Sequence, residues 1–120
     1  MQTIETEGRQ VIVDGAHNEQ KMRAFLASLV SRYPEQKFDF VLAMKKTKDF
    51  ASVIKLLKPY ADTVVCTELQ ENTVSAEDLA SVCRDLGVEC VVEQDIKKAV
   101  ELCSDKCVVT GSLYAAKLLV

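Results

Sequence analysis

The 120-residue sequence contains no apolar run near the roughly 20 residues that cross a membrane, and its polar start, M-Q-T-I-E-T-E, is unlike a secretory signal. It also has no excess of positive charge, because 15 Lys and Arg against 18 Asp and Glu give a net charge of −3. A chain with this balance has no electrostatic reason to bind nucleic acid or an anionic membrane. We therefore expect a cytoplasmic protein whose partners are neither nucleic acids nor membranes.

The sequence also has no C-x-x-C pair and only one histidine. Metal sites typically use closely spaced, paired ligands of these types, so we expect no metal ligands among the cysteines. Four of the five cysteines fall inside apolar strand or helix patterns, where a thiol behaves as a small hydrophobic side chain. We expect all five to be reduced and structural, as in a reducing compartment. They are Cys66, Cys83, Cys90, Cys103 and Cys107.

Two glycine-rich nucleotide motifs are missing as well. The absence of G-x-x-x-x-G-K-[ST] excludes a complete phosphate cradle, and the absence of G-x-G-x-x-G excludes the ordinary dinucleotide fingerprint. The composition itself, 48% hydrophobic and 28% charged, is that of an ordinary globular protein. A chain of this length buries roughly two-thirds of its unfolded surface without disulfides or metals, so residues 1–120 are expected to form one domain.

Strand and helix patterns alternate along the chain. After a weak edge strand within residues 1–6, strands are predicted at 11–13, 38–44, 63–67, 90–93 and 107–110. Helices are predicted over 19–33, after a cap at Asp49, after a cap at Ser75, over 95–102, and from Ser112 onward. Because parallel strands need crossover connections, this alternation predicts an α/β fold with a mostly parallel sheet of five or six strands and helices on both faces.

The stretch V-I-V-D-G-A-H-N, residues 11–18, has the form of a ligand-binding turn between a strand and a helix. Asp14 falls at the carboxyl end of a buried strand, which is the edge where ligands bind in open α/β sheets. Asn18 is suited to cap the following helix, whose free N–H groups point towards a ligand. His17, the single histidine, lies beside this turn.

Three polar loops are expected at that edge if the sheet is parallel. They carry Asp14 with His17, the lysines at 45, 46 and 48, and Thr110-Gly111-Ser112. A carboxylate, an imidazole, ammonium groups and a hydroxyl suit a phosphate- or carboxylate-bearing ligand near a sugar hydroxyl. Each group also has a purely structural interpretation: Asp14 and Ser112 as caps, and the histidine and lysines as solvated surface groups.

The stretches V-I-V-D-G-A-H-N and V-V-T-G-S-L-Y resemble the two signature sequences of the carboxyl-terminal domain of folylpolyglutamate synthase and its bifunctional dihydrofolate synthase relative, in the Mur ligase superfamily. M-K-K-T-K-D-F, residues 44–50, is similar to that family's loop after the second strand, so the resemblance covers nearly the whole chain. It implies a Rossmann-like domain of an ATP-dependent ligase. In that reaction a folate or dihydropteroate carboxylate becomes an acyl phosphate, which the amino group of L-glutamate attacks.

The resemblance further implies a partner domain on the amino-terminal side. In the family that ATPase domain carries the P-loop, most of the Mg²⁺ ligands and the folate pocket, none of which this sequence contains. The present chain would then supply half a site and be inactive alone, because most groups that position the phosphates lie elsewhere.

Individual roles are implied in the same way. Asp14 and Asn18 would bind the nucleotide, Asp14 through the ribose hydroxyls, and His17 would lie near the phosphates as the candidate catalytic residue. Lys48 and Ser112 would meet the incoming glutamate, where an ammonium neutralises a carboxylate and a hydroxyl orients it.

Two departures from the family pattern concern the helix entry and the lysine loop. Glu19 replaces the proline common after Asn18. Lys45 and Lys46 occupy positions that are commonly small or apolar, so which lysine faces the substrate stays open between these two and Lys48.

Two other functions compete with a ligase domain. One is a standalone Rossmann-like module that binds a nucleotide or amino acid for regulation without catalysis. The other is a phospho-acceptor receiver domain, which requires an aspartate after the third strand and a lysine after the fifth. Thr67 and Ser112 stand near those places instead, which disfavours the receiver.

Overall fold

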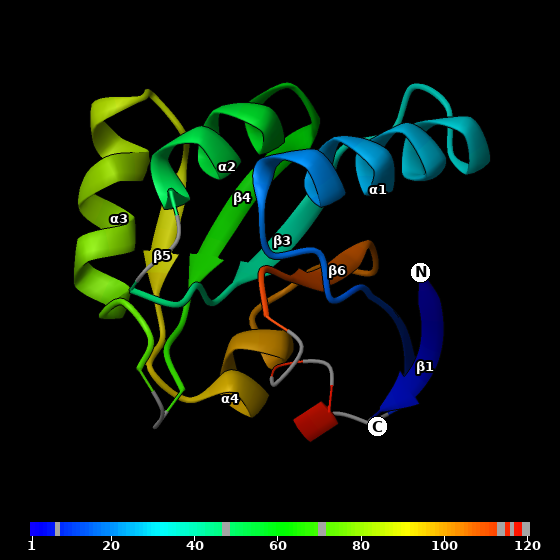
Figure 1. Ribbon diagram of the computed structural model, residues 1–120. Coiled ribbons are helices and arrows are strands. Elements are labelled where there is room, and N and C mark those ends of the chain that lie inside the picture. Colours follow the sequence, from blue (N-terminus) through cyan, green and yellow to red (C-terminus); the bar gives the residue numbers. More distant parts are fainter. Residues whose placement is uncertain (7, 47–48, 70–71, 113–114, 116, 119–120) are drawn as a thin grey trace.

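The computed structural model describes residues 1–6, 8–46, 49–69, 72–112, 115 and 117–118 (Figure 1). The strands are β1 (Gln2–Thr6), β2 (Arg9–Val13), β3 (Phe38–Leu42), β4 (Ala61–Cys66), β5 (Cys90–Val92) and β6 (Cys107–Thr110). The helices are α1 (Glu19–Arg32), α2 (Phe50–Leu57), the 3₁₀ turn η1 (Lys58–Tyr60), α3 (Ala76–Asp85) and α4 (Ile96–Glu101). Residues 115, 117 and 118, within the predicted last helix, have helical backbone.

The strands form one six-stranded sheet in the order β1-β2-β6-β3-β4-β5. β1 pairs antiparallel with β2, and every other neighbouring pair is parallel. The predicted fold class is therefore confirmed, including the edge strand at the amino end. The last strand, β6, lies between β2 and β3, so these two consecutive strands are not neighbours, and each pairs with β6 instead.

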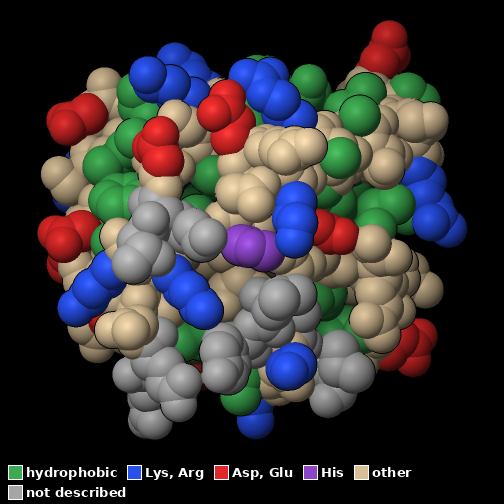
Figure 2. All heavy atoms as spheres, in the orientation of Figure 1, with side chains coloured by type: hydrophobic (Ala, Val, Ile, Leu, Met, Phe, Trp, Pro, Cys, Tyr) green, Lys and Arg blue, Asp and Glu red, His purple; other side chains and the backbone are tan. Residues whose placement is uncertain are grey.

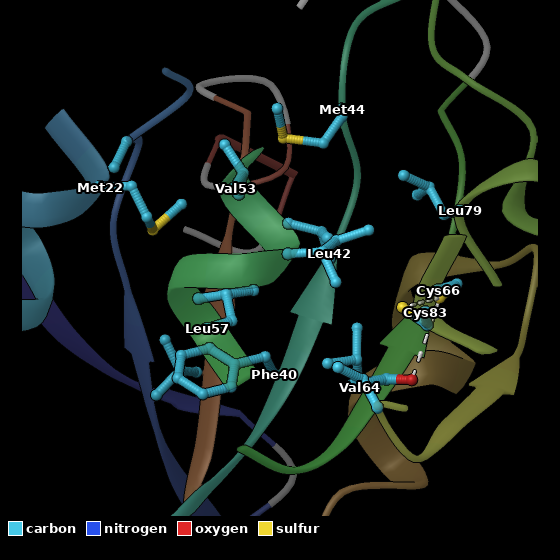
Figure 3. Packing of buried hydrophobic residues seen from close by; sticks show 14 of the residues in the cluster. Met22, Phe40, Leu42, Met44, Val53, Leu57, Val64, Cys66, Leu79 and Cys83 are labelled. Atoms are coloured by element: carbon cyan, nitrogen blue, oxygen red, sulfur yellow. Dashed lines mark hydrogen bonds between the residues drawn. The ribbon is translucent and has the colours of Figure 1, made fainter. Parts of the chain in front are cut away.

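Helices cover both faces of the sheet, as predicted. α1, α2 and α3 lie side by side over one face, and α4 lies on the other together with Ala115 (Figure 1). Because side chains alternate along a strand, Phe40 and Leu42 of β3 point towards α2, whereas Val41 joins the opposite cluster. Figure 3 shows Phe40 and Leu42 packed beside Leu57 of α2.

Among the described residues, no helix is both long enough and apolar enough to span a bilayer.

The helix caps predicted from Asn18, Asp49 and Ser75 are confirmed. Each side chain accepts an N–H from the first turn of its helix, at donor–acceptor distances of 2.8, 3.2 and 3.1 Å respectively. Asp95, predicted as the first residue of its helix, is instead the N-cap of α4. Short polar side chains just before a helix satisfy N–H groups that lack intrahelical partners, which explains why the sequence predicts where these helices begin.

Several predicted boundaries are wrong by one or two residues. The second strand was expected to continue through Met44, but β3 ends at Leu42, because the Met44 carbonyl accepts a hydrogen bond from Val74 N–H at 2.8 Å outside the sheet. Residues 43 and 44 are nevertheless buried, and burial rather than pairing produced their strand-like pattern. The other shifts are of the same size: β4 covers 61–66 rather than 63–67, β5 ends at Val92, α1 at Arg32 and α4 at Glu101.

Candidate functional site

The turns that follow β2 and β6 are joined by hydrogen bonds at the carboxyl edge of the sheet. Asp14 N–H donates to the carbonyl of Val109 at 3.0 Å. The carbonyl of Ala16 accepts Gly111 N–H at 2.9 Å and the Thr110 hydroxyl at 3.4 Å. The predicted convergence of the V-I-V-D-G-A-H-N and V-V-T-G-S-L-Y stretches is confirmed for the described residues, and the Ala16 and Val109 carbonyls accept the hydrogen bonds that join them.

Gly111 lies directly against the turn that follows β3, so this turn belongs to the same edge of the sheet. Its φ is +98°, and a Cβ built on it would lie 2.5 Å from the carbonyl oxygen of Ala43, 2.7 Å from Leu42 Cδ1 and 3.0 Å from Met44 Sδ. The backbone of residue 111 therefore lies directly against the 42–44 segment, and no side chain fits between them. Only glycine satisfies both the left-handed conformation and the close approach.

The carboxylate of Asp14 lies at the mouth of this edge with its side chain 19% exposed. Its Oδ2 accepts the N–H of Ala16 at 3.0 Å, which fixes the rotamer in a short turn. Its Oδ1 lies 2.8 Å from the amino group of Met1. One oxygen thus shapes the turn, and the other faces a cationic hydrogen-bond donor.

His17 is partly buried, and its Nδ1 lies 3.0 Å from the carbonyl oxygen of Gly15. A carbonyl only accepts, so Nδ1 carries the hydrogen and Nε2 is the nitrogen left for a ligand. Asn18 uses its side-chain oxygen to cap α1, which leaves its NH₂ as the group with donors to spare. Figure 2 shows the histidine, in purple, open to solvent with Lys or Arg side chains nearby.

A cavity of about 420 Å³ lies between this turn and one side of α1. Its wall combines the turn with residues at helical spacing on α1, which makes it partly apolar and partly charged. The lining residues are Met1, Asp14, Gly15, Ala16, His17, Lys21, Ala24, Phe25 and Ser28. Sequence analysis predicts no functional role for Lys21 or Ser28. The feature that could have identified them is their spacing of three and ten residues from Asn18 on the same helix.

The lysine loop after β3 pairs with the loop after β4, which the sequence did not predict. Lys45 forms an antiparallel bridge with Thr73, and Lys46 N–H donates to the carbonyl of Asn72 at 3.0 Å. Asn72 adopts a left-handed φ of +54°, a conformation that asparagine tolerates better than most residues. Both lysines are exposed, and Lys48 lies outside the described residues.

Ser112 follows Gly111 directly and is only 3% exposed. Its contact with a substrate stays a prediction. No three His, Cys, Asp or Glu side chains in the described part of the chain are grouped so that they could hold a metal ion. Asp14, the only carboxylate that lines the cavity, offers too few oxygens for Mg²⁺, so the described residues do not fit a magnesium site of their own.

The family of the Mur ligase, glutamate ligase domain matches residues 1–113. The chain belongs to this family. It is 34% identical over 114 residues to the UDP-N-acetylmuramyl-tripeptide synthetase of Latilactobacillus sakei subsp. sakei (strain 23K), covering 84% of this chain and 22% of that protein.

Solved structures share the domain's fold. Folylpolyglutamate synthase from Thermotoga maritima superposes with a TM-score of 0.87 at 22% identity, covering 98% of this chain and 29% of that one. A bifunctional folylpolyglutamate synthase/dihydrofolate synthase with Mn, AMPPNP and L-glutamate bound superposes with a TM-score of 0.76 at 24% identity, covering 98% and 30%. The chain thus spans less than a third of the length of each of these relatives.

Proposed function

We propose that this domain forms one side of the active site of an ATP-dependent ligase that joins L-glutamate to a folate-type acid. The observation that carries the proposal is the junction at Ala16, whose carbonyl ties the Asp14–His17 turn to the Thr110–Ser112 turn. A ligase of this kind must hold a nucleotide and an amino acid close together, and the two turns suit one ligand each. Membership of the glutamate ligase domain family supports the same function.

The nucleotide is proposed to bind at the cavity beside Asp14. Asp14 Oδ2 accepts the N–H of Ala16, which leaves Oδ1 as the acceptor for a ligand, and ribose hydroxyls are donors of suitable size. His17 presents Nε2, which donates to a phosphate oxygen when the ring is doubly protonated. Lys21, on the same cavity wall, adds positive charge for the phosphates, and the NH₂ of Asn18 adds a neutral donor.

The glutamate is proposed to bind across the lysine loop and Ser112. In the reaction, a carboxylate oxygen of the acid takes the γ-phosphoryl group of ATP and ADP leaves. The amino group of glutamate then attacks the acyl carbon, loses a proton, and phosphate leaves as the amide forms. The domain contributes position and positive charge, which is how most phosphoryl-transfer sites accelerate their reactions. Mg²⁺ would be held mainly by an amino-terminal ATPase domain.

The identity of the acid substrate is the least constrained part of the proposal, because the pocket for this substrate is expected on the amino-terminal ATPase domain. A second candidate acid is a UDP-N-acetylmuramyl peptide, which the 34% identity to a UDP-N-acetylmuramyl-tripeptide synthetase favours. The folate assignment rests on the resemblance of the two signature stretches and on fold similarity to folylpolyglutamate synthases.

An NMR titration of the uniformly ¹⁵N-labelled chain tests the binding half of the proposal. Mg·ATP is expected to shift the amides of residues 14–18 and 21–28, and L-glutamate those of 45–49 and 110–114. His17→Ala should weaken the ATP response, whereas Lys97→Ala, an exposed change on α4 over the opposite face, should not. Absence of any shift at millimolar ligand, with and without the ATPase domain, would contradict the proposal.

Joining the chain to its ATPase domain tests the reaction. We expect glutamate-dependent ADP release with a folate or dihydropteroate and none from the 120-residue chain alone. Turnover with a UDP-N-acetylmuramyl peptide but not with a folate would replace the folate assignment, and turnover by the isolated chain would refute the half-site.

A further inference from the structure

Three of the five cysteines meet on the α3 side of the sheet. β4 and β5 pair Val64 with Cys90 and Cys66 with Val92, so Cys66 and Cys90 point to the same face as diagonal neighbours. Cys83 of α3 lies over them. Its Sγ is 3.9 Å from Cys66 Sγ. Figure 3 shows Cys66 and Cys83 side by side.

The three thiols differ in their access to solvent. Cys66 and Cys83 are 0% exposed, whereas Cys90 is partly exposed because β5 is the edge strand of the sheet. The Cys90 thiol points at the carbonyl of Ala80, 3.7 Å away and one helical turn before Cys83. A dissolved reagent therefore reaches the cluster at Cys90, which lies beside the turn of α3 that carries Cys83.

Hydrogen bonding within the cluster favours Cys83 as the internal nucleophile. The hydrogen bond between the Cys66 and Cys83 thiols, in which either sulfur can be the donor, holds the pKa of Cys83 below its ordinary value and raises the pKa of Cys66. Burial raises the pKa of the Cys90 thiol, so its reaction with a reagent is slow. The mixed disulfide formed there lies beside the turn of α3 that carries Cys83.

We propose that Cys83 and Cys90 are a reversible oxidation site for low-molecular-weight disulfides of the glutathione type. The Cys90 thiolate attacks one sulfur of the small disulfide, forms a mixed disulfide and expels one small thiolate. The Cys83 thiolate then attacks the Cys90 sulfur, forms the internal disulfide and expels the second small thiolate. Two protein thiols are oxidised and one small disulfide is reduced to two thiols, with the two protons passing to the released thiolates.

The remaining two cysteines provide an internal control. Cys103 and Cys107 lie next to each other, and both belong to the core cluster on the opposite face. They are 4% and 1% exposed, so this pair has no member that a reagent reaches from solvent. The thiols are neighbours in both clusters, but only the first cluster has a thiol, that of Cys90, which a dissolved reagent can reach. The folded chain should therefore oxidise at Cys83–Cys90 and spare Cys103–Cys107.

The experiment incubates the reduced, folded chain in mixtures of reduced and oxidised glutathione, quenches it with acid, alkylates the free thiols in denaturant and maps them by mass spectrometry. We expect two fewer alkyl groups than in the reduced control, with the unlabelled pair located at a Cys83–Cys90 disulfide and the labels restored by dithiothreitol. Cys90→Ser should abolish thiol loss, and Cys83→Ala should stop the reaction at a glutathione adduct on Cys90, with circular dichroism confirming that both variants are folded.

Three outcomes would overturn the proposal. One is a Cys103–Cys107 disulfide formed at the same rate. Another is undiminished oxidation in the Cys90→Ser variant, which would mean that reagents enter by another route. The third is no disulfide in the folded wild type at any glutathione ratio, combined with ready oxidation in denaturant.

Discussion

Replacing Gly111 by alanine should destabilise the domain more than any ordinary glycine replacement. The new Cβ would lie 2.5 Å from the Ala43 carbonyl oxygen, a backbone atom that cannot rotate away. Overpacking of this kind costs about 1–3 kcal/mol. The left-handed φ of +98° adds about 1–2 kcal/mol for a residue with a Cβ. We expect a total loss of roughly 2–5 kcal/mol from a stability of about 5–15 kcal/mol.

The matched control is Gly8→Ala. Gly8 also has a positive φ, +77°, but no atom lies within 4 Å of the position its Cβ would take. Only the conformational cost applies there, about 1–2 kcal/mol. Urea unfolding followed by circular dichroism measures both variants, and with an m-value of about 1.5 kcal/mol/M the Gly111→Ala midpoint should fall by roughly 1–3 M. Equal destabilisation of the two variants, within about 0.5 kcal/mol, would refute the steric explanation.

Two further changes test local electrostatics and capping. Asn18→Ala removes the acceptor for Lys21 N–H and should lower the free energy of unfolding by about 1 kcal/mol in the same urea assay; an unchanged midpoint would mean that the cap contributes nothing. Hydrogen bonds from the Ser52 hydroxyl and N–H hold the pKa of Asp49 below its usual value of 3.8, so the stabilisation by this charge is complete above that pH and is lost as the pH falls through the lowered pKa. The stability difference between wild type and Asp49→Asn should therefore shrink in acid, and a difference that stays constant from neutral pH to about pH 2 would contradict the assignment.

Features set by local sequence were the ones that could be predicted. Alternating apolar patterns gave the elements, and caps such as Ser75 gave helix starts, because both depend on residues close in the chain. Strand order depends on pairing between distant segments and left no local signal. The Arg9 guanidinium illustrates this, since it donates to the carbonyls of Val100 and Cys103 at 2.8 and 2.7 Å across 91 and 94 residues.

The same distinction between local and long-range features applies to the residues of the candidate site. Asp14 and His17 were predictable because a buried strand ends directly before them, and the structure places both on the cavity wall. The pairing of Lys45 with Thr73 was not predictable, since it depends on β3 and β4 lying side by side. The meeting of Cys66, Cys83 and Cys90 depends likewise on the register between β4 and β5, which spacing alone does not reveal.

The central place of β6 also determines when the domain can fold during synthesis. β6 pairs with both β2 and β3, yet it is the last of the six strands to leave the ribosome. Until residues 107–110 emerge, β1–β2 and β3–β4–β5 lack the strand that joins them, and any pairing within either group leaves an open edge. Such edges are prone to pair with other chains. Because the turns after β2 and β6 are joined by hydrogen bonds, we expect the candidate site to form only when β6 completes the sheet.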